Sequence, residues 1–322
     1  MDKNILILGG SGFVGRHVIE HLHRLGARIT VPTRRLDAAR HLWSLPRVEV
    51  QRVDATDPAT LAALMAGHDA VVNLIAILHG SAERFEQVHV ELPRRIAAAC
   101  AASGVRRLVH VSALGAAEDA PSRYQRSKAR GEAVLRQAAA TGALEPTLLR
   151  PSVIFGAGDR FLNLFVGLQK LFPLIPLAGA EARFQPVWVR DVASALVRCL
   201  QEPASIGQTY ELCGPDVWSL RELVHAAGVW AGVRGGRGRP IVGLPAALGW
   251  VQALAMEWLP GEPLMSRDNL DSMKVDNVAS GQWPGLAALG IAPAPLAAVG
   301  PIYLGGAGAA ARLDAYRRTA GR

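Results

Sequence analysis

The chain has 322 residues, half of them hydrophobic, with three cysteines and a formal net charge of +8. This length and composition suit one large α/β domain, or a main domain with a smaller lobe, and exclude a largely disordered chain. Only four of the 35 basic residues are lysines; the cations form no block of like charge, and zinc-ligand spacings are absent. We therefore expect neither nucleic-acid nor metal binding.

The cysteines and the apolar runs bear on the cellular compartment. Cys100, Cys199 and Cys213 lie in apolar contexts at spacings that suit neither disulfides nor metal sites, so we expect reduced core residues. The first apolar run, residues 5–8, is too short for a signal peptide, and no run reaches the roughly eighteen residues that span a bilayer. These features predict a cytoplasmic protein, and peripheral contact at the inner face of the inner membrane stays open.

Up to about residue 150, short apolar runs alternate with longer segments rich in Ala, Leu and Arg. The predicted strands are 4–8, 28–32, 48–53, 69–75, 107–112 and 146–150, and the predicted helices are 13–25, 57–66, 83–103 and 124–141. Strands that are apolar throughout are typical of a parallel sheet covered on both faces. The pattern predicts an α/β fold, a Rossmann-like doubly wound parallel sheet over residues 1–150.

A glycine-rich turn follows the first predicted strand directly. It reads G-x-x-G-x-x-G, and an amphipathic run begins inside it. Glycines there allow a tight turn and close approach of a pyrophosphate, which the helix N-terminus attracts through its amides and dipole. The context predicts a nicotinamide dinucleotide site, and its candidate residues are Gly9, Ser11, Gly12, Phe13, Val14, Gly15 and Arg16.

The end of the second predicted strand bears on which dinucleotide is bound. Arg34 and Arg35 stand where an NAD-selective site would place an acidic residue for the ribose 2′-hydroxyl. Because a guanidinium can fork two hydrogen bonds to a 2′-phosphate, NADP(H) is favoured over NAD(H), which remains an alternative. Asp54, with Ala55 after the third strand, is a candidate for the adenine.

The fifth predicted strand ends at Ser112, and a Y-x-x-x-K pattern follows at Tyr124 and Lys128. Positions i and i+4 share one helix face, so the phenol and the ammonium can both meet one ligand. The ammonium, together with the positive nicotinamide ring, would favour the phenolate and bring the tyrosine pKa into working range. The pattern predicts Ser112, Tyr124 and Lys128 as a catalytic set, with Lys128 also a candidate for the nicotinamide ribose.

After Pro151 the pattern changes, and residues 151–322 are expected to form a smaller lobe that returns some elements to the main sheet. A helix is predicted at 191–201, a strand at 208–213, a helix at 218–231 and an apolar helix at 244–259. Two segments, 161–176 and 244–259, are rich in apolar residues. They could line an apolar pocket, dock on a membrane or partner, or pack as core, which is the simplest interpretation.

These motifs together make the chain resemble an extended or atypical short-chain dehydrogenase/reductase. The resemblance also covers residues 73–76 and 150–156, and it implies that Leu74, Ile75, Ala76, Pro151 and Val153 border the cofactor. Within that superfamily, residues 31–35, 88–95, 183–187 and 264–270 resemble the NAD(P)H-binding accessory subunit of respiratory complex I and its bacterial relatives. His89 stands where many extended enzymes carry an asparagine, and it is expected to be a structural hydrogen-bonder.

Three functions follow from the motifs and the resemblance. The first is an NADP(H)-dependent oxidoreductase that acts on a carbonyl or hydroxyl of an apolar or quinone-like small molecule. The second is a non-catalytic subunit or assembly partner of a membrane-bound respiratory complex, with the dinucleotide as a structural ligand. The third is a nucleotide-sugar epimerase or dehydratase. The substrate itself is not predicted by the sequence.

Overall fold

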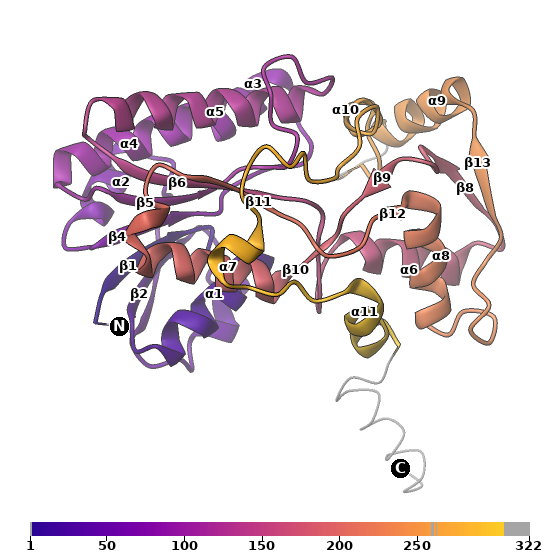
Figure 1. The fold of residues 1–322 in the computed structure, drawn as a ribbon, viewed down its shortest axis with the longest axis horizontal. Coiled ribbons are helices and arrows are strands. Elements are labelled where there is room, and N and C mark those ends of the chain that lie inside the picture. Colours follow the sequence, from indigo (N-terminus) through magenta and orange to yellow (C-terminus); the bar gives the residue numbers. More distant parts are fainter. Residues whose placement is uncertain (1, 259–260, 262, 306–322) are drawn as a thin grey trace, which may run out of the picture. The chain divides into compact units, whose positions relative to one another are not determined.

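The computed structural model describes residues 2–258, 261 and 263–305. The chain divides into two compact units, whose elements Figure 1 labels. The first unit comprises residues 1–151, 189–212 and 279–292, and the second comprises residues 152–188, 213–278 and 293–322. The chain therefore leaves the first unit after Pro151 and returns to it twice.

The first unit is built on a seven-stranded parallel sheet in the order β11-β6-β5-β4-β1-β2-β3. Its strands are β1 (Asn4–Leu8), β2 (Arg28–Thr33), β3 (Val48–Arg52), β4 (Ala70–Asn73), β5 (Arg107–Val111), β6 (Glu145–Pro151) and β11 (Thr209–Leu212). β1 and β4 are neighbours, with Leu8 opposite Asn73, and from them the strand order runs outward in opposite directions. Ligands of doubly wound sheets bind where these two directions separate, at the carboxyl ends of the strands.

Helices cover both faces of this sheet, as Figure 1 shows. One layer contains α2 (Pro58–Met65), α3 (Ala82–Glu86), α4 (Leu92–Ser103) and α5 (Arg123–Ala140), and the other contains α1 (Phe13–Arg24) and α7 (Val189–Gln201). Short 3-10 turns occupy Leu36–Leu42, Pro203–Ser205 and Leu286–Leu289. The two layers explain why the central strands are apolar along their whole length.

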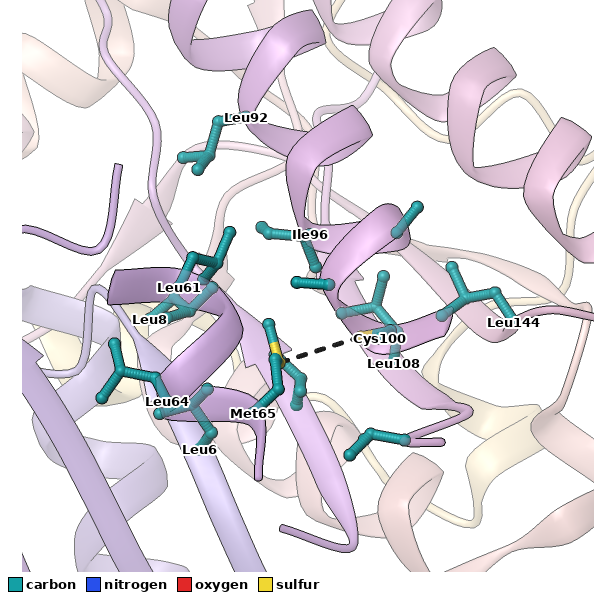
Figure 2. Packing of buried hydrophobic residues seen from close by; sticks show 14 of the residues in the cluster. Leu6, Leu8, Leu61, Leu64, Met65, Leu92, Ile96, Cys100, Leu108 and Leu144 are labelled. Carbon is teal, nitrogen blue, oxygen red and sulfur yellow. Dashed lines mark hydrogen bonds between the residues drawn. The ribbon is translucent and has the colours of Figure 1, made fainter. Parts of the chain in front are cut away.

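Buried aliphatic side chains fill the space between the sheet and the first helical layer. Figure 2 shows Leu6 and Leu8 of β1 facing Leu61 and Met65 of α2, with Ile96 of α4 beside them. Cys100 lies in the same cluster, and its thiol is 3.9 Å from the sulfur of Met65. All three cysteines are free and buried, and burial raises the pKa of Cys100 to about 12.

The predicted doubly wound sheet is confirmed. Both ends of each predicted strand of the first unit lie within two residues of the ends of the observed strand. The predicted helix at 83–103 differs, because a π-helical turn over Gln87–Glu91 separates α3 from α4. The carbonyl of His89 projects from this turn toward α5, where a Cβ on Gly131 would come within 1.9 Å of it. Glycine at residue 131 thus permits the close approach of the two segments.

The second unit contains short strands and five helices in its described part. The strands are β7 (Ile154–Phe155), β8 (Ile175–Ala178), β9 (Arg183–Phe184), β10 (Val187–Trp188), β12 (Trp218–Ser219) and β13 (Ile241–Leu244). The helices are α6 (Phe161–Leu171), α8 (Leu220–Trp230), α9 (Ala246–Glu257), α10 (Arg267–Ser272) and α11 (Leu296–Leu304). α6 and α8 pack together around a core that includes Phe165, Leu223 and Leu296.

The two apolar segments of this unit differ in their packing. α6 buries Leu162, Phe165 and Val166, as expected for core, but its last residue, Leu171, and the following residues to Leu174 are exposed. In α9 only Gly249 and Ala253 are buried, so the core interpretation was wrong for this helix. The predicted helix end at residue 259 lies outside the described residues.

In the part of the chain that the structure describes, none of the helices combines the length and the apolar character needed to cross a bilayer.

Candidate functional site

The glycine turn after β1 is shaped by two close backbone approaches. Gly9 has φ +81°, and a Cβ there would meet the backbone of Leu74 and Ile75 at 3.1–3.2 Å. A Cβ on Gly15 would come within 2.3 Å of the Gly10 carbonyl oxygen, so α1 packs tightly on the turn. α1 begins at Phe13 after Gly12 and has no side-chain cap, which leaves its first-turn amides for a ligand. This geometry fits a pyrophosphate.

A short polar chain connects this turn to the end of β2. The hydroxyls of Ser11 and Thr33 are 3.4 Å apart, and the Thr33 hydroxyl donates to the Arg35 carbonyl oxygen at 3.1 Å. The Arg35 amide donates back to the Thr33 hydroxyl at 3.3 Å. Arg34 and Arg35 are exposed. Sequence reasoning gave Thr33 no role, although it directly precedes the two arginines and bonds to the backbone of Arg35.

Asp54 and Asp57 follow β3 and make different hydrogen bonds. The Asp54 carboxylate accepts bonds from the amide and the hydroxyl of Thr56, and these bonds, aided by Arg34, lower its pKa. Asp57 caps α2 by accepting from the Thr60 amide. Asp54 is exposed, while the neighbouring Ala55 is packed into the core cluster. Capping is thus assigned to Asp57.

Arg16 is oriented by neighbours on its own helix. Its guanidinium lies 5.5 Å from the centre of the Phe13 ring, and its Nε donates to His17 Nε2 at 3.4 Å. Pro151 ends β6, where its carbonyl accepts from the Leu114 amide at 3.0 Å. Val153 belongs to the second unit, and its carbonyl accepts from the Val187 amide there.

The segment after β4, residues 74–77, is held at three amides. Leu74 donates to the Leu8 carbonyl at 2.9 Å, and Ile75 donates to the Asn73 side-chain oxygen at 3.1 Å. Ile77 donates to Nε2 of His89 at 3.2 Å. The Asn73 amide in turn donates to Nδ1 of the buried His110 at 3.0 Å. A segment fixed in this way offers a stable wall for a ligand over β1 and β4.

Ser112 follows β5 and combines burial with an unused hydroxyl. Its amide donates to the Leu149 carbonyl at 2.7 Å, which extends the pairing of β5 with β6 by one residue. The side chain is only 4% exposed, yet its Oγ has no hydrogen-bond partner among the described residues. A buried polar atom without a partner is costly, so a hydroxyl in this state indicates a place for a ligand oxygen.

Lys128 lies on α5 beside the end of the same strand. Its ammonium donates to the Val111 carbonyl at 2.8 Å, directly before Ser112, and the side chain is 2% exposed. Burial lowers the pKa of Lys128 to about 8, while the carboxylate of Glu132 acts in the opposite direction. Two of the three ammonium protons remain for other acceptors.

Tyr124 precedes Lys128 by four residues on the same helix. Burial raises the pKa of Tyr124 to about 12, so the phenol is neutral at physiological pH. This direction is opposite to the drop expected beside the ammonium and the nicotinamide ring, because burial of the phenol disfavours its charged form. A neutral phenol on this face is a proton donor.

His89 connects α5 to the segment after β4. Its Nε2 accepts from Ile77, so Nδ1 carries the hydrogen and donates to the Ser127 hydroxyl at 2.8 Å. Ser127 passes the chain on by donating to the Tyr124 carbonyl at 2.7 Å. The ring also contacts Tyr124 edge-on at 5.5 Å. Burial and the charge of Lys128 lower the pKa of His89 to about 3, so it acts as a neutral structural link.

One turn beyond Lys128, Glu132 anchors α5 to β6. The carboxylate is fully buried and accepts two bonds from Arg150, at 2.9 and 2.6 Å. Arg136 adds a third bond at 2.8 Å from the surface side. Sequence reasoning missed Glu132, although it continues the i, i+4 spacing of Tyr124 and Lys128.

The structure thus gathers the predicted residues of the first unit into two groups on one sheet. The glycine turn, Ser11 with Arg35, and Leu74 with Ile75 are joined by the contacts above, and Ser112 and Lys128 are joined through Val111. Asp54 connects to the first group only through the charge of Arg34. The turn and the uncapped helix fit the pyrophosphate of a dinucleotide, and the Ser112 hydroxyl, which has no partner among the described residues, follows β5 of the same sheet.

Comparison with known proteins identifies the group to which the sequence is related. Residues 5–213, more than half of the chain, match the family described as the NAD dependent epimerase/dehydratase family. The chain belongs to this family. The predicted resemblance to extended short-chain dehydrogenases/reductases is thereby confirmed, and the family is NAD(P)-dependent.

Similar proteins and a similar solved structure agree with this membership. The mitochondrial NADH dehydrogenase [ubiquinone] 1 alpha subcomplex subunit 9 of Mus musculus is 32% identical over 90% of this chain and 76% of its own length. The ceramide reductase of Caulobacter vibrioides is 33% identical over 62% of this chain and 61% of its own length. The dTDP-glucose 4,6-dehydratase of Streptomyces venezuelae, solved with NAD and TYD bound, has the same fold, with a TM-score of 0.66 and 22% identity over 76% of this chain and 85% of that one.

Proposed function

We propose that the protein is an NADP(H)-dependent oxidoreductase that reduces a carbonyl group of an apolar small molecule. The observation that carries this proposal is the buried Ser112 hydroxyl, which has no partner among the described residues and follows the carbonyl that binds Lys128. An oxygen of the substrate would satisfy this hydroxyl. The arrangement is the one that a polarised carbonyl requires.

Each residue of the set has a separate task in this proposal. Ser112 donates a hydrogen bond that holds and polarises the substrate oxygen. Tyr124, a neutral phenol, donates the proton to that oxygen as it becomes an alcohol. Lys128 stabilises the phenolate that remains and has protons left for the nicotinamide ribose. When bound, the reduced nicotinamide supplies the hydride.

The dinucleotide would be held along the glycine turn of the first unit. Gly9, Ser11, Gly12 and the first turn of α1 would take the pyrophosphate, and Leu74 to Ala76 with Pro151 would border the nicotinamide. Asp54 and Ala55 would border the adenine, Asp54 through its exposed carboxylate. The phosphorylated cofactor is favoured because two exposed arginines follow β2 where an acidic residue would select NAD.

Replacing both arginines tests the choice of cofactor. In an Arg34→Ala/Arg35→Ala variant we expect NADPH affinity to fall about 10- to 100-fold, because charge-assisted hydrogen bonds contribute about 1.5–3 kcal/mol. NADH affinity should change little, since it has no 2′-phosphate. Fluorescence titration of both cofactors measures this, and an unchanged NADPH preference would exclude the two arginines from the phosphate site. Arg52→Ala, on the neighbouring strand, is the matched control.

The substrate class is tested by a panel of acceptors. Apolar ketones, quinones and long-chain lipid ketones are offered with NADPH, and the loss of nicotinamide absorbance is followed. A relative named for ceramide reduction supports the lipid-like members of this panel. If no acceptor in the panel is reduced, and nucleotide sugars alone react, the oxidoreductase proposal is wrong.

The pH dependence of reduction follows from Lys128. Because its pKa is about 8, we expect kcat/KM to be constant below that pH and to fall about tenfold per unit above it. Lys128→Arg keeps the charge and should move this decline to higher pH. Titration of Lys128 does not destabilise the fold over the same pH range. Its pKa in the folded protein lies below the ordinary 10.5, so between these two values the unfolded chain binds more protons than the folded protein. The free energy of unfolding therefore rises with pH there, and loss of the fold through this group cannot explain a falling kcat/KM.

A second candidate is a structural role in a membrane-bound respiratory complex. It is supported by the 32% identity to a subunit of mitochondrial NADH dehydrogenase over 90% of this chain. In that case the protein would sit at the cytoplasmic face of the inner membrane with NADPH as a structural ligand. Affinity purification from native membranes should then recover the complex. Removal of NADPH should lower the melting temperature of the protein, and no NADPH oxidation should be detectable.

A further inference from the structure

We propose that the second unit docks on an anionic lipid bilayer through an apolar surface formed by α9, β13 and residues 171–176. This surface is called the docking patch below. It shares no residue with the dinucleotide site, and the proposal stands or fails independently of carbonyl reduction.

α9 turns its larger apolar side chains outward. Leu248, Val251 and Trp258 follow one another at helical spacing and are exposed, Trp258 by 82%. The residues that face inward are small: Gly249 and Ala253 are buried, and a Cβ on Gly249 would meet that of Ala178 in β8 at 2.8 Å. A helix of a globular domain normally hides its larger apolar side chains, so this arrangement indicates an apolar environment outside the unit.

The patch continues from α9 onto neighbouring segments. The Gln252 side chain donates to the Pro176 carbonyl at 3.2 Å, and Pro176 pairs with the exposed Val242 of β13. Directly before β8, the run Leu-Phe-Pro-Leu at 171–174 is exposed throughout, with Leu171 at 74%. Exposed apolar side chains thus occur on three neighbouring segments, which are α9, β13 and the run before β8.

Charge decides which partner fits this surface. The segments that form and border it, residues 160–181 and 223–257, contain five cations and two acids, Glu181 and Glu257. Glu181 is paired with Arg221 at 2.8 Å. The cations are Arg160, Lys170, Arg234, Arg237 and Arg239. Arg239 donates to Gln169 at the end of α6, which brings the arginine-bearing loop beside Lys170 and the exposed run. The single charge of α9, Glu257, is neutralised by Arg267 at 2.9 Å.

Because both acids are paired with arginines, the border of this apolar surface has a net positive charge, which matches an anionic membrane face. In this proposal the exposed apolar side chains insert among the acyl chains, and the basic residues of the neighbouring segments bind the lipid phosphates. Trp250 and Trp258 suit the level of the headgroups, where indole rings are enriched. Arg267 lies over the Trp250 ring at 5.4 Å, so a cation already accompanies one of them.

Sedimentation with vesicles tests the docking patch on the full chain. We expect the protein to pellet with vesicles that contain phosphatidylglycerol and phosphatidylcholine, and less with phosphatidylcholine alone. The variant Leu248→Gln/Val251→Gln/Trp258→Gln should lose affinity for the anionic vesicles by at least about tenfold. Raising the salt concentration should weaken binding of the wild type.

A control variant makes the same kinds of substitution outside the docking patch. Trp43→Gln/Val275→Gln/Ile302→Gln replaces one tryptophan and two aliphatic residues that are exposed outside the patch, and it should pellet like the wild type. Circular dichroism and NADPH titration verify that both variants fold. The proposal is overturned if the wild type does not pellet with anionic vesicles, or if the patch variant pellets with them equally well. It is also overturned if the wild type binds only to membranes that contain other proteins, which would indicate a protein partner.

Discussion

Replacing Tyr124 with Phe is expected to lower the rate of NADPH-dependent carbonyl reduction by about 10²- to 10⁴-fold, the usual contribution of a positioned proton donor. The change removes one oxygen and keeps the ring that contacts His89, so α5 should retain its position. NADPH affinity should be nearly unchanged, because the phenol is not among the groups that would hold the phosphates. Single-turnover kinetics and cofactor titration separate the two effects.

The control for this variant is Tyr210→Phe, on the edge strand β11 of the same sheet. It removes an equivalent oxygen from a buried tyrosine, and we expect the reduction rate to stay at the wild-type level. A Tyr124→Phe variant that kept more than about a tenth of the wild-type rate would contradict a role as proton donor. It would favour the structural function of the dinucleotide instead.

The second large effect concerns the ion pair that joins α5 to β6. Glu132→Ala is expected to lower the free energy of unfolding by about 3–5 kcal/mol, because it leaves a largely buried guanidinium without its counter-charge. The Arg150 side chain is only 12% exposed, and its guanidinium donates two hydrogen bonds to this carboxylate. Urea denaturation followed by tryptophan fluorescence measures the change.

The matched control is a surface ion pair that joins Glu86 of α3 to Arg130 of α5. Glu86→Ala breaks the contact with Arg130, in which both side chains are substantially exposed, and should cost less than about 1 kcal/mol. In a double variant, Arg150→Met combined with Glu132→Leu, much of the lost stability should return, since no buried charge is then unpaired. Equal costs for Glu132→Ala and Glu86→Ala would show that burial adds nothing to this pair.

Much of the first unit could be predicted because its signals are local. Apolar strands, the glycine turn and the spacing of Tyr124 and Lys128 each depend on a few neighbouring residues, and together they define a doubly wound sheet with a dinucleotide turn. The caps of α2 and α5 by Asp57 and Ser122 are of the same kind.

What the sequence could not predict depends on contacts between distant segments. His89 and Ile77, Thr33 and Ser11, and Glu132 and Arg150 acquire their roles only when separate elements meet. The π-helical turn at 87–91 has no simple periodicity, and the direction of the Tyr124 pKa depends on burial. In α9 the apolar pattern was clear, but periodicity does not state which side of a helix faces the protein.

The return of the chain to the first unit has a consequence for its synthesis. β11, the strand beside β6, and α7, which packs against α1, both follow the long departure after Pro151. A nascent chain that has emerged only to Pro151 therefore exposes the edge of β6 and the face of α1 that α7 covers, and unpaired edges invite aggregation. The dinucleotide-binding half of the sequence is thus not a module that can be cut out at residue 151 and expressed alone.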